Sequence, residues 1–256
     1  MKKVISFDLY ADMGFLKKPD INEKIYLTYN MLHKPCVLGV LGAIVGLKGF
    51  TKNNEFPEYY KKLKDIPIGI KPIGKGCEHG NFAKNVTTYT NTIGFANADG
   101  NLIVSEQTLI NPAYRIFLLL DLEKEDEQTL YNRIRQQEAA YIPYLGKNDY
   151  SAWWYKEDMK EYNFRKFEGG VEFKIDTIFI KETPVVNNIV EYQSRFRNNL
   201  SFLNGSFMYF EKLPIRYNEK LYQYDYSDFA YTDWLLSKDS FIENLYEVDN
   251  LFIQLN

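Results

Sequence analysis

Few residues in this sequence could carry out acid–base or nucleophilic chemistry. The chain has two histidines, His33 and His79, so a catalytic triad or a Cys/His pair would have to use one of them. Cys77-Glu78-His79 places up to three metal-ligating side chains together, but a structural zinc site needs four ligands and the sequence offers no second cluster. We therefore interpret residues 77–79 as a surface loop. We predict no catalytic residue, no metal and no cofactor.

A second group of residues suits nucleic-acid binding. Aromatic rings and cations are interleaved in the segment that leads up to residue 35, and they are Lys17, Lys18, Lys24, Tyr26, Tyr29, His33 and Lys34. Aromatic faces stack on unpaired bases, cations bind phosphate, and the N-terminus of a helix attracts anions. Alternatively, the tyrosines cover the core and the lysines are solvated. The residues alone favour this alternative, because RNA-recognition sheets carry aromatics on their central strands, where Phe7 and Phe117 are expected in the core.

The segment that follows predicts a buried helix that begins at Pro35 and ends at Gly49. Its residues are almost all apolar, which is typical of a helix surrounded by protein. Gly39, Gly42 and Gly46 share one flank at helical spacing. Glycine in a helix costs about 1 kcal/mol relative to alanine, so we expect close approach of another backbone to offset that cost. The apolar run of residues 36–47 is too short for a membrane span, which needs ~20 residues, so we expect no membrane partner.

The remaining pattern of the first 147 residues predicts alternating strands and helices. Alternation or apolar runs predict strands at residues 3–10, 66–73, 114–122 and 140–145, and a helix at 125–138. Residues 87–95 and 102–110 predict two hairpin arms around Asp99-Gly100, a strong turn signal. The arms are polar, so the hairpin either extends to contact a partner or lies on its own sheet. The order β-α-β-hairpin-β-α-β is that of a ferredoxin-like, or RNA-recognition-motif-like, α+β domain.

Residues 148–256 differ in composition, being acidic and rich in tyrosine. We predict strands there at residues 171–180, 207–213 and 221–226 and a helix at 239–246. The sequence thus suggests a ferredoxin-like domain over residues 1–150, with a hairpin insert at about 85–112, and a smaller β-rich C-terminal region over 151–256.

The formal net charge of −3 argues against a general nucleic-acid-binding protein. Residues 1–100 carry 14 Lys and Arg against 9 Asp and Glu, a net of +5, whereas residues 101–256 carry 17 against 25, a net of −8. This asymmetry hints at an anionic partner for the basic part, although by itself it is more typical of solvated surface. Two cysteines cannot form a disulfide framework, and the charged N-terminus is unlike a secretory signal, so we expect a cytoplasmic protein.

The residues around the glycine-rich helix resemble a known family. Residues 26–47, from Tyr26 through His33-Lys34-Pro35 to Leu47, closely resemble the signature of CRISPR-associated (Cas) protein family five in the RAMP superfamily. Residues 141–147 resemble that family's second signature. The opening strand with residues 15–19 is most similar to the type I-B branch, and the similarity extends to residue 154.

The resemblance implies a ferredoxin-like domain with a protruding hairpin, or thumb, here the one around Asp99-Gly100. It implies a role in antiviral defence as an RNA-binding subunit that caps the five-prime handle of the CRISPR guide RNA (crRNA) in the Cascade surveillance complex. The implied partners are this RNA, the Cascade backbone and large subunits, and target DNA indirectly. The implied RNA contacts fall before the glycine-rich helix and at the Gly146-Lys147 loop, and the candidates are Lys17, Lys18, Tyr29, His33, Lys34 and Lys147.

Two other functions stay open at this point. One branch of the family, in type I-C systems, is a metal-independent endoribonuclease that cleaves precursor RNA with Tyr, Lys and His. Its Lys-His pair has no counterpart in residues 114–122, and His33-Lys34 lies in a different element, so we expect no catalysis. The second alternative is an unrelated α/β interaction module, which the acidic balance of the chain would suit.

Overall fold

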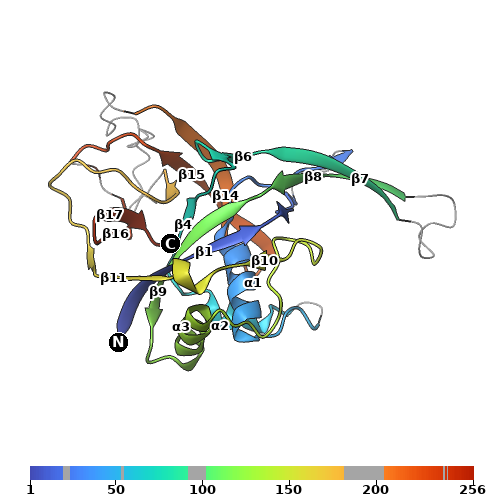
Figure 1. Ribbon diagram of the computed structural model, residues 1–256, viewed down its shortest axis with the longest axis horizontal. Coiled ribbons are helices and arrows are strands. Elements are labelled where there is room, and N and C mark those ends of the chain that lie inside the picture. The colour runs from blue at the N-terminus through green and yellow to red at the C-terminus, as the bar shows by residue number, and fades with distance from the viewer. Residues whose placement is uncertain (20–23, 53–54, 92–101, 182–204, 239, 241) are drawn as a thin grey trace.

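The computed structural model describes residues 1–19, 24–52, 55–91, 102–181, 205–238, 240 and 242–256 (Figure 1). The expected turn at Asp99-Gly100 lies outside these residues. The described chain is mixed α+β, rich in strands, with three α-helices. None of these helices is both long enough and apolar enough to span a membrane.

The main sheet has β1 and β9 at its centre. Its strands run in the order β10-β1-β9-β4, with antiparallel neighbours, and β11 also pairs with β1. Their bounds are Lys2–Ala11 for β1, Ile68–Pro72 for β4, Ala113–Asp121 for β9, Ala152–Trp153 for β10 and Lys160–Tyr162 for β11. The expected strands at residues 3–10, 66–73 and 114–122 are confirmed, and Ile5, Phe7 and Leu9 lie in the core as their alternation predicts.

The expected strand at residues 140–145 is wrong. The backbone N–H groups of Ala140 and Tyr141 instead donate to the carbonyls of Ile44 and Ala43. These carbonyls belong to the last turn of a helix, where they lack partners within the helix. The place beside β1 is taken by β10 and β11, two strands that follow the expected domain boundary.

Figure 1 shows the three helices grouped on one side of the main sheet. They are α1 (Lys34–Val45), α2 (Glu58–Leu63) and α3 (Glu125–Gln136). His33 caps the N-terminus of α1, with Pro35 in its first turn. The expected end at Gly49 is wrong, because Gly46 adopts φ 88° and its N–H donates to the Gly42 carbonyl. Gly46 is thus the left-handed cap of the helix, a conformation that glycine adopts without steric cost.

The three glycines of this flank have different surroundings. A Cβ added at Gly42 would overlap the Cβ of Tyr59 on α2 and lie 2.9 Å from its Cγ. At Gly46 it would lie 2.8 Å from the Cβ of Ala140, whereas at Gly39 it would meet nothing within 4 Å. The expected close approach therefore exists at Gly42 and Gly46, against side-chain atoms instead of a backbone, and it is absent at Gly39.

Gly42→Ala and Gly39→Ala are a matched pair on one helix. We expect Gly42→Ala to lower the free energy of unfolding by about 1–3 kcal/mol, because Tyr59 must shift to admit the methyl group. Gly39→Ala is expected to raise it by up to about 1 kcal/mol, through helix propensity alone. Urea unfolding of both variants measures the difference, and equal effects would contradict the packing role of Gly42.

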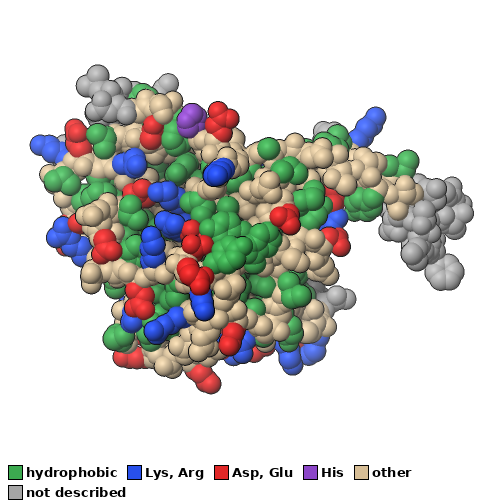
Figure 2. Space-filling view, viewed as in Figure 1, with side chains coloured by type: hydrophobic (Ala, Val, Ile, Leu, Met, Phe, Trp, Pro, Cys, Tyr) green, Lys and Arg blue, Asp and Glu red, His purple; other side chains and the backbone are tan. Residues whose placement is uncertain are grey.

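A hairpin projects from the body of the molecule (Figures 1 and 2). Its arms are β7 (Lys84–Asn91) and β8 (Leu102–Ile110), which pair antiparallel. They carry one lysine and one glutamate, and Figure 2 shows mostly uncharged side chains along them. On its other edge β8 pairs with β2 (Met13–Gly14) and, in parallel, with β3 (Ile25–Tyr26). The segment before α1 is therefore attached to the hairpin base.

The C-terminal part is rich in strands and shares the core. Leu213 and Phe229 belong to the same apolar cluster as α1 and the main sheet. Two further sheets are formed, in strand order, by β13-β15-β14 and β12-β16-β17, and β5 pairs with β6. Their bounds are Cys77–Glu78 (β5), Asn81–Phe82 (β6), Phe164–Lys166 (β12), Phe179–Ile180 (β13), Met208–Asn218 (β14), Gln223–Thr232 (β15), Leu245–Val248 (β16) and Leu251–Gln254 (β17).

Two of the C-terminal expectations are wrong. Of the strand expected at residues 171–180, only Phe179–Ile180 is a strand, because Phe173 and Ile175 form single bridges instead. The helix expected at residues 239–246 does not form in the described residues, where β16 begins at Leu245 and pairs with β17.

Candidate nucleic-acid interface

A cavity of about 400 Å³ lies at the base of the hairpin, and we call it the hairpin-base cavity. Five parts of the chain contribute to it: the segment before α1, the first turns of α1, both hairpin arms, the loop at residues 146–147, and β15. It is lined by Phe15, Leu16, Lys17, Tyr26, His33, Cys36, Tyr89, Glu106, Gly146, Lys147 and Tyr224. Of the six expected RNA contacts, the fold brings Lys17, His33 and Lys147 together here, and not Lys18, Tyr29 and Lys34.

Lys17 and Tyr26 form one side of the cavity. The Lys17 Nζ atom lies 3.9 Å from the centroid of the Tyr26 ring, a cation–π contact. Lys17 also bridges to Thr28 through the backbone, and its side chain is exposed. A cation held over a ring at a cavity rim offers both a phosphate contact and a stacking surface.

Lys147 also lines the cavity. Its Nζ atom lies 2.5 Å from the Glu106 Oε1 atom, and 4.8 Å and 5.7 Å from the ring centroids of Tyr89 and Tyr150. Burial on its own lowers the pKa of the Lys147 ammonium, but the hydrogen bond and charge of Glu106 outweigh it, so that pKa is raised. The ammonium group is therefore charged at neutral pH and surrounded by three aromatic rings, the third being Phe15 at 5.9 Å.

Gly146 places Lys147 at the cavity. It adopts φ +87°, and an added Cβ would overlap the carbonyl oxygen of Phe15. The Phe15 N–H donates to the Leu145 carbonyl at 3.0 Å, so the two segments are in direct contact. Only glycine combines this conformation with this approach.

His33 cannot supply the cation that was expected of it. Its Nδ1 atom accepts a hydrogen bond from the Cys36 N–H at 3.4 Å, and its ring packs edge-on against Tyr29 and Tyr224. Burial lowers the pKa of His33 to about 3. The ring is therefore neutral at physiological pH, and it forms part of the cavity wall as a helix cap.

The other three expected contacts are engaged within the protein. Tyr29 is 2% exposed, and its hydroxyl donates to that of Tyr226, so its ring cannot stack on a base. Lys18 pairs with Glu211 at 3.5 Å. The Lys34 Nζ atom donates to the carbonyl of Asn256 at 2.8 Å, and burial lowers its pKa to about 8.

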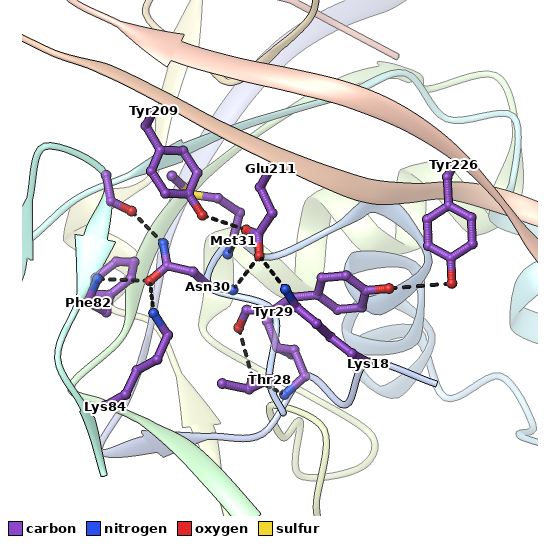
Figure 3. Close-up of polar contacts among 12 residues, drawn as sticks. Lys18, Thr28, Tyr29, Asn30, Met31, Phe82, Lys84, Tyr209, Glu211 and Tyr226 are labelled. Carbon is purple, nitrogen blue, oxygen red and sulfur yellow. Dashed lines mark hydrogen bonds and ion pairs between the residues drawn. The ribbon is translucent and has the colours of Figure 1, made fainter. Parts of the chain in front are cut away.

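A network around Asn30 and Glu211 fixes the segment between Tyr26 and α1 (Figure 3). Glu211, on β14, accepts from the backbone N–H groups of Asn30 and Met31 at 3.0 Å and 2.9 Å and from the Tyr209 hydroxyl at 2.7 Å. The Asn30 side chain donates to the Gly80 carbonyl and accepts from the Phe82 N–H and Lys84 Nζ. The hydroxyl of Tyr114 in β9 donates to the Asn30 carbonyl. The segment between Tyr26 and α1 is thus attached to three other parts of the fold.

Part of the charge difference between residues 1–100 and residues 101–256 is neutralised by ion pairs within the protein. Lysines of the basic part pair with acids of the acidic part, at 3.5 Å for Lys18–Glu211, 2.5 Å for Lys64–Glu219 and 3.0 Å for Lys71–Asp176. This charge difference is therefore a weaker indication of an anionic partner than the lysines that line the hairpin-base cavity. Among the described residues, no group of three or more His, Cys, Asp or Glu side chains is placed to hold a metal ion.

The sequence did not single out Glu106, Tyr89 or Tyr150. Glu106 lies beside Tyr26 because β3 and β8 pair in parallel, with these two residues in register. Neighbours that meet through strand pairing leave no local pattern, and a glutamate in a polar arm has no feature that distinguishes it.

No protein-family model and no curated protein sequence matches the chain. Among solved structures, "Cryo-EM structure of the Type III-B Cmr-beta bound to cognate target RNA and AMPPnP, state 1" aligns with a TM-score of 0.48 and 9% identity over 92% of this chain and 86% of that one. A chain of "CRISPR RNA-guided surveillance complex" aligns with a TM-score of 0.46 and 11% identity over 91% and 90%. A CRISPR protein from Archaeoglobus fulgidus aligns with a TM-score of 0.50 and 11% identity over 99% of this chain and 98% of that one. The chain therefore shares, over almost its whole length, the fold of this archaeal CRISPR protein.

Proposed function

We propose that this chain is a non-catalytic RNA-binding subunit of a CRISPR effector complex of the type I Cascade kind, and that it caps the five-prime handle of the guide RNA. The observation that carries the proposal is the hairpin-base cavity, where Lys17 over Tyr26 and Lys147 between Tyr89 and Tyr150 combine cations with stacking surfaces. This combination suits an unpaired strand, whose bases stack while its phosphates contact lysines.

The fold and the two sequence signatures support the same proposal. The strand order β10-β1-β9-β4, with α1 and α2 between β1 and β4 and α3 between β9 and β10, suits a ferredoxin-like domain of the RAMP superfamily. The projecting arms β7 and β8 are the proposed thumb, through which the chain would contact a backbone subunit. The type I-B branch, the large subunit as a neighbour and an indirect contact with target DNA belong to this proposal through the sequence resemblance.

The absence of catalysis is also part of the proposal. His33, the histidine that lines the cavity, is a neutral helix cap packed between Tyr29 and Tyr224. Incubating the purified full chain with CRISPR repeat RNA in EDTA tests this point directly. Intact RNA is expected, and specific cleavage would favour the endoribonuclease alternative.

Binding itself is tested with fluorescence anisotropy of a 3′-fluorescein-labelled RNA octamer taken from the five-prime handle of the repeat. We expect Lys17→Met to weaken binding about tenfold, equivalent to roughly 1.4 kcal/mol, because one phosphate contact is lost. The slope of log affinity against log salt should fall by about 0.7, the value for one phosphate contact on a single strand.

Lys52→Met is the matched control, because Lys52 is an exposed lysine paired only weakly, at 3.5 Å, with Glu55. It is expected to leave both affinity and salt slope unchanged. If the wild-type chain shows no salt-dependent RNA binding, or if both variants behave alike, the proposed interface is wrong.

A further inference from the structure

Glu106 is the one carboxylate among the described residues that line the hairpin-base cavity. Its side chain is 3% exposed. A buried negative charge is unfavourable unless it has a partner, which for Glu106 is Lys147, and beside a phosphate-binding surface it still repels the RNA backbone. Attraction of phosphate therefore does not explain why Glu106 lies in this cavity.

The two oxygens of Glu106 have different partners. Oε1 accepts from Lys147 Nζ at 2.5 Å and lies 3.5 Å from the Tyr150 hydroxyl. Within the described residues, the Tyr89 hydroxyl donates to Oε2 at 3.5 Å, the outer limit of a hydrogen bond. An ionised carboxylate offers about four lone-pair positions, so Oε2 can accept at least one further hydrogen bond.

Stacking surfaces flank this carboxylate on both sides. On one side, Glu106 pairs in register with Tyr26 of the parallel strand β3. On the other side it lies opposite Thr87 of β7, and Tyr89 follows Thr87 by two positions on that strand. Residues two apart on a strand share a face, so Tyr89 lies diagonally beside Glu106 on the same face of the hairpin. A base stacked on Tyr89 would lie close to Oε2, because the Tyr89 hydroxyl is 3.5 Å from this oxygen. The volume of the cavity, about 400 Å³, is within the range of small-molecule binding sites, so a single base can enter it.

We propose that the hairpin-base cavity takes one unpaired nucleobase that carries an exocyclic amino group, and that Glu106 accepts a hydrogen bond from this group. Glu106 is then the residue that determines base preference, while Lys17 binds phosphate. Lys147 pairs with Glu106 through one of its three N–H donors and can donate another to phosphate. The inference rests on the proposed RNA-binding function and adds a substrate preference to it. Uracil is disfavoured because its Watson–Crick edge presents two carbonyl oxygens, which the carboxylate repels, on either side of its single N–H.

The test compares cytidine with uridine, which have the same size and differ at this edge by an amino group and a carbonyl. The probes are 3′-fluorescein-labelled octauridylate and eight derivatives, each with a single cytidine, titrated with the full chain. We expect cytidine at one position to bind about tenfold more tightly than uridine, as for a carboxylate that accepts from a cytosine amino group. Glu106→Gln should bring the ratio close to one, because an amide offers a donor to uracil as well as an acceptor to cytosine.

Glu161→Gln is the matched control. Glu161 also accepts from one lysine, Lys3, and one tyrosine, Tyr131, each at 2.5 Å, and it does not line the cavity. This variant should keep the tenfold preference. A second measurement needs no variant: adenosine should bind about tenfold more tightly than purine riboside, which lacks the amino group, at the same position.

The outcomes are distinct. RNA binding without a cytidine preference at any position, or a preference that Glu106→Gln leaves unchanged, overturns this inference and leaves the proposed function standing. If no octamer binds, the proposed function fails, and the inference fails with it.

Discussion

Gly146→Ala is expected to lower the free energy of unfolding by more than about 3 kcal/mol. The residue has φ +87°, where a Cβ is strained, and the added methyl group would overlap the carbonyl oxygen of Phe15. The obstacle is backbone, so it cannot turn away as a flexible side chain does. Relief requires the loop at residues 146–147 to separate from the segment at Phe15. Urea unfolding followed by circular dichroism measures the loss.

Gly170→Ala is the control that measures backbone strain in the absence of a steric overlap. Gly170 has φ +95°, but an added Cβ would meet nothing within 4 Å, so the cost there is limited to about 1–2 kcal/mol of backbone strain. Gly146→Ala should also weaken binding of the RNA octamer strongly at temperatures where the variant is folded, because Lys147 moves with its loop. Equal destabilisation in the two variants, with RNA binding intact, would contradict the positioning role of Gly146.

Glu211→Ala is expected to destabilise the protein by about 3–5 kcal/mol, as removal of a buried charged partner does. The carboxylate is 9% exposed and accepts from two backbone N–H groups, of Asn30 and Met31, which the substitution leaves unpaired. The ammonium group of Lys18 and the hydroxyl of Tyr209 lose their acceptor as well. Each buried donor without a partner costs about 1–3 kcal/mol.

Glu219→Ala is the appropriate comparison, since Glu219 follows β14 and pairs with Lys64 at 2.5 Å, but is 53% exposed. Such a surface pair contributes about 0–1 kcal/mol, so this variant should be nearly as stable as the wild type. Asn30 and Met31 lie between Tyr26 and α1, so Glu211→Ala should also reduce RNA affinity. A Glu211→Ala variant with wild-type stability would show that the network in Figure 3 does not hold this segment.

Local sequence determined much of the secondary structure. The alternation in residues 3–10 and the apolar run in 114–122 were sufficient to predict β1 and β9, because burial of one or both faces determines which residues a strand can carry. Acidic residues in the first turn, Glu125, Asp126 and Glu127, marked the beginning of α3. The beginning of α1 was predicted to within one residue from Pro35.

Where the sequence offered several equivalent residues for one structural role, tertiary contacts determined which of them takes that role. Gly46 and Gly49 could each end α1, and Gly46 does so where Ala140 and Tyr141 donate to the last carbonyls of the helix. The same hydrogen bonds keep residues 140–145 out of the main sheet, so β10 and β11 take the place beside β1. An apolar segment signals burial or pairing, but its sequence does not say which partner it pairs with.

For the candidate site, too, some features were predictable from the sequence and others depended on the fold. Residue types and spacing alone placed cations and aromatic rings before α1 and so pointed to Lys17, whereas Lys147 was named only through the resemblance of residues 141–147 to a family signature. Burial of Tyr29, neutrality of His33 and the pairing of Lys18 with Glu211 came only from the fold. Glu106 reached the cavity through the parallel pairing of β3 with β8. Residue type states what a side chain can do, whereas its exposure and its partners depend on segments far away in the chain.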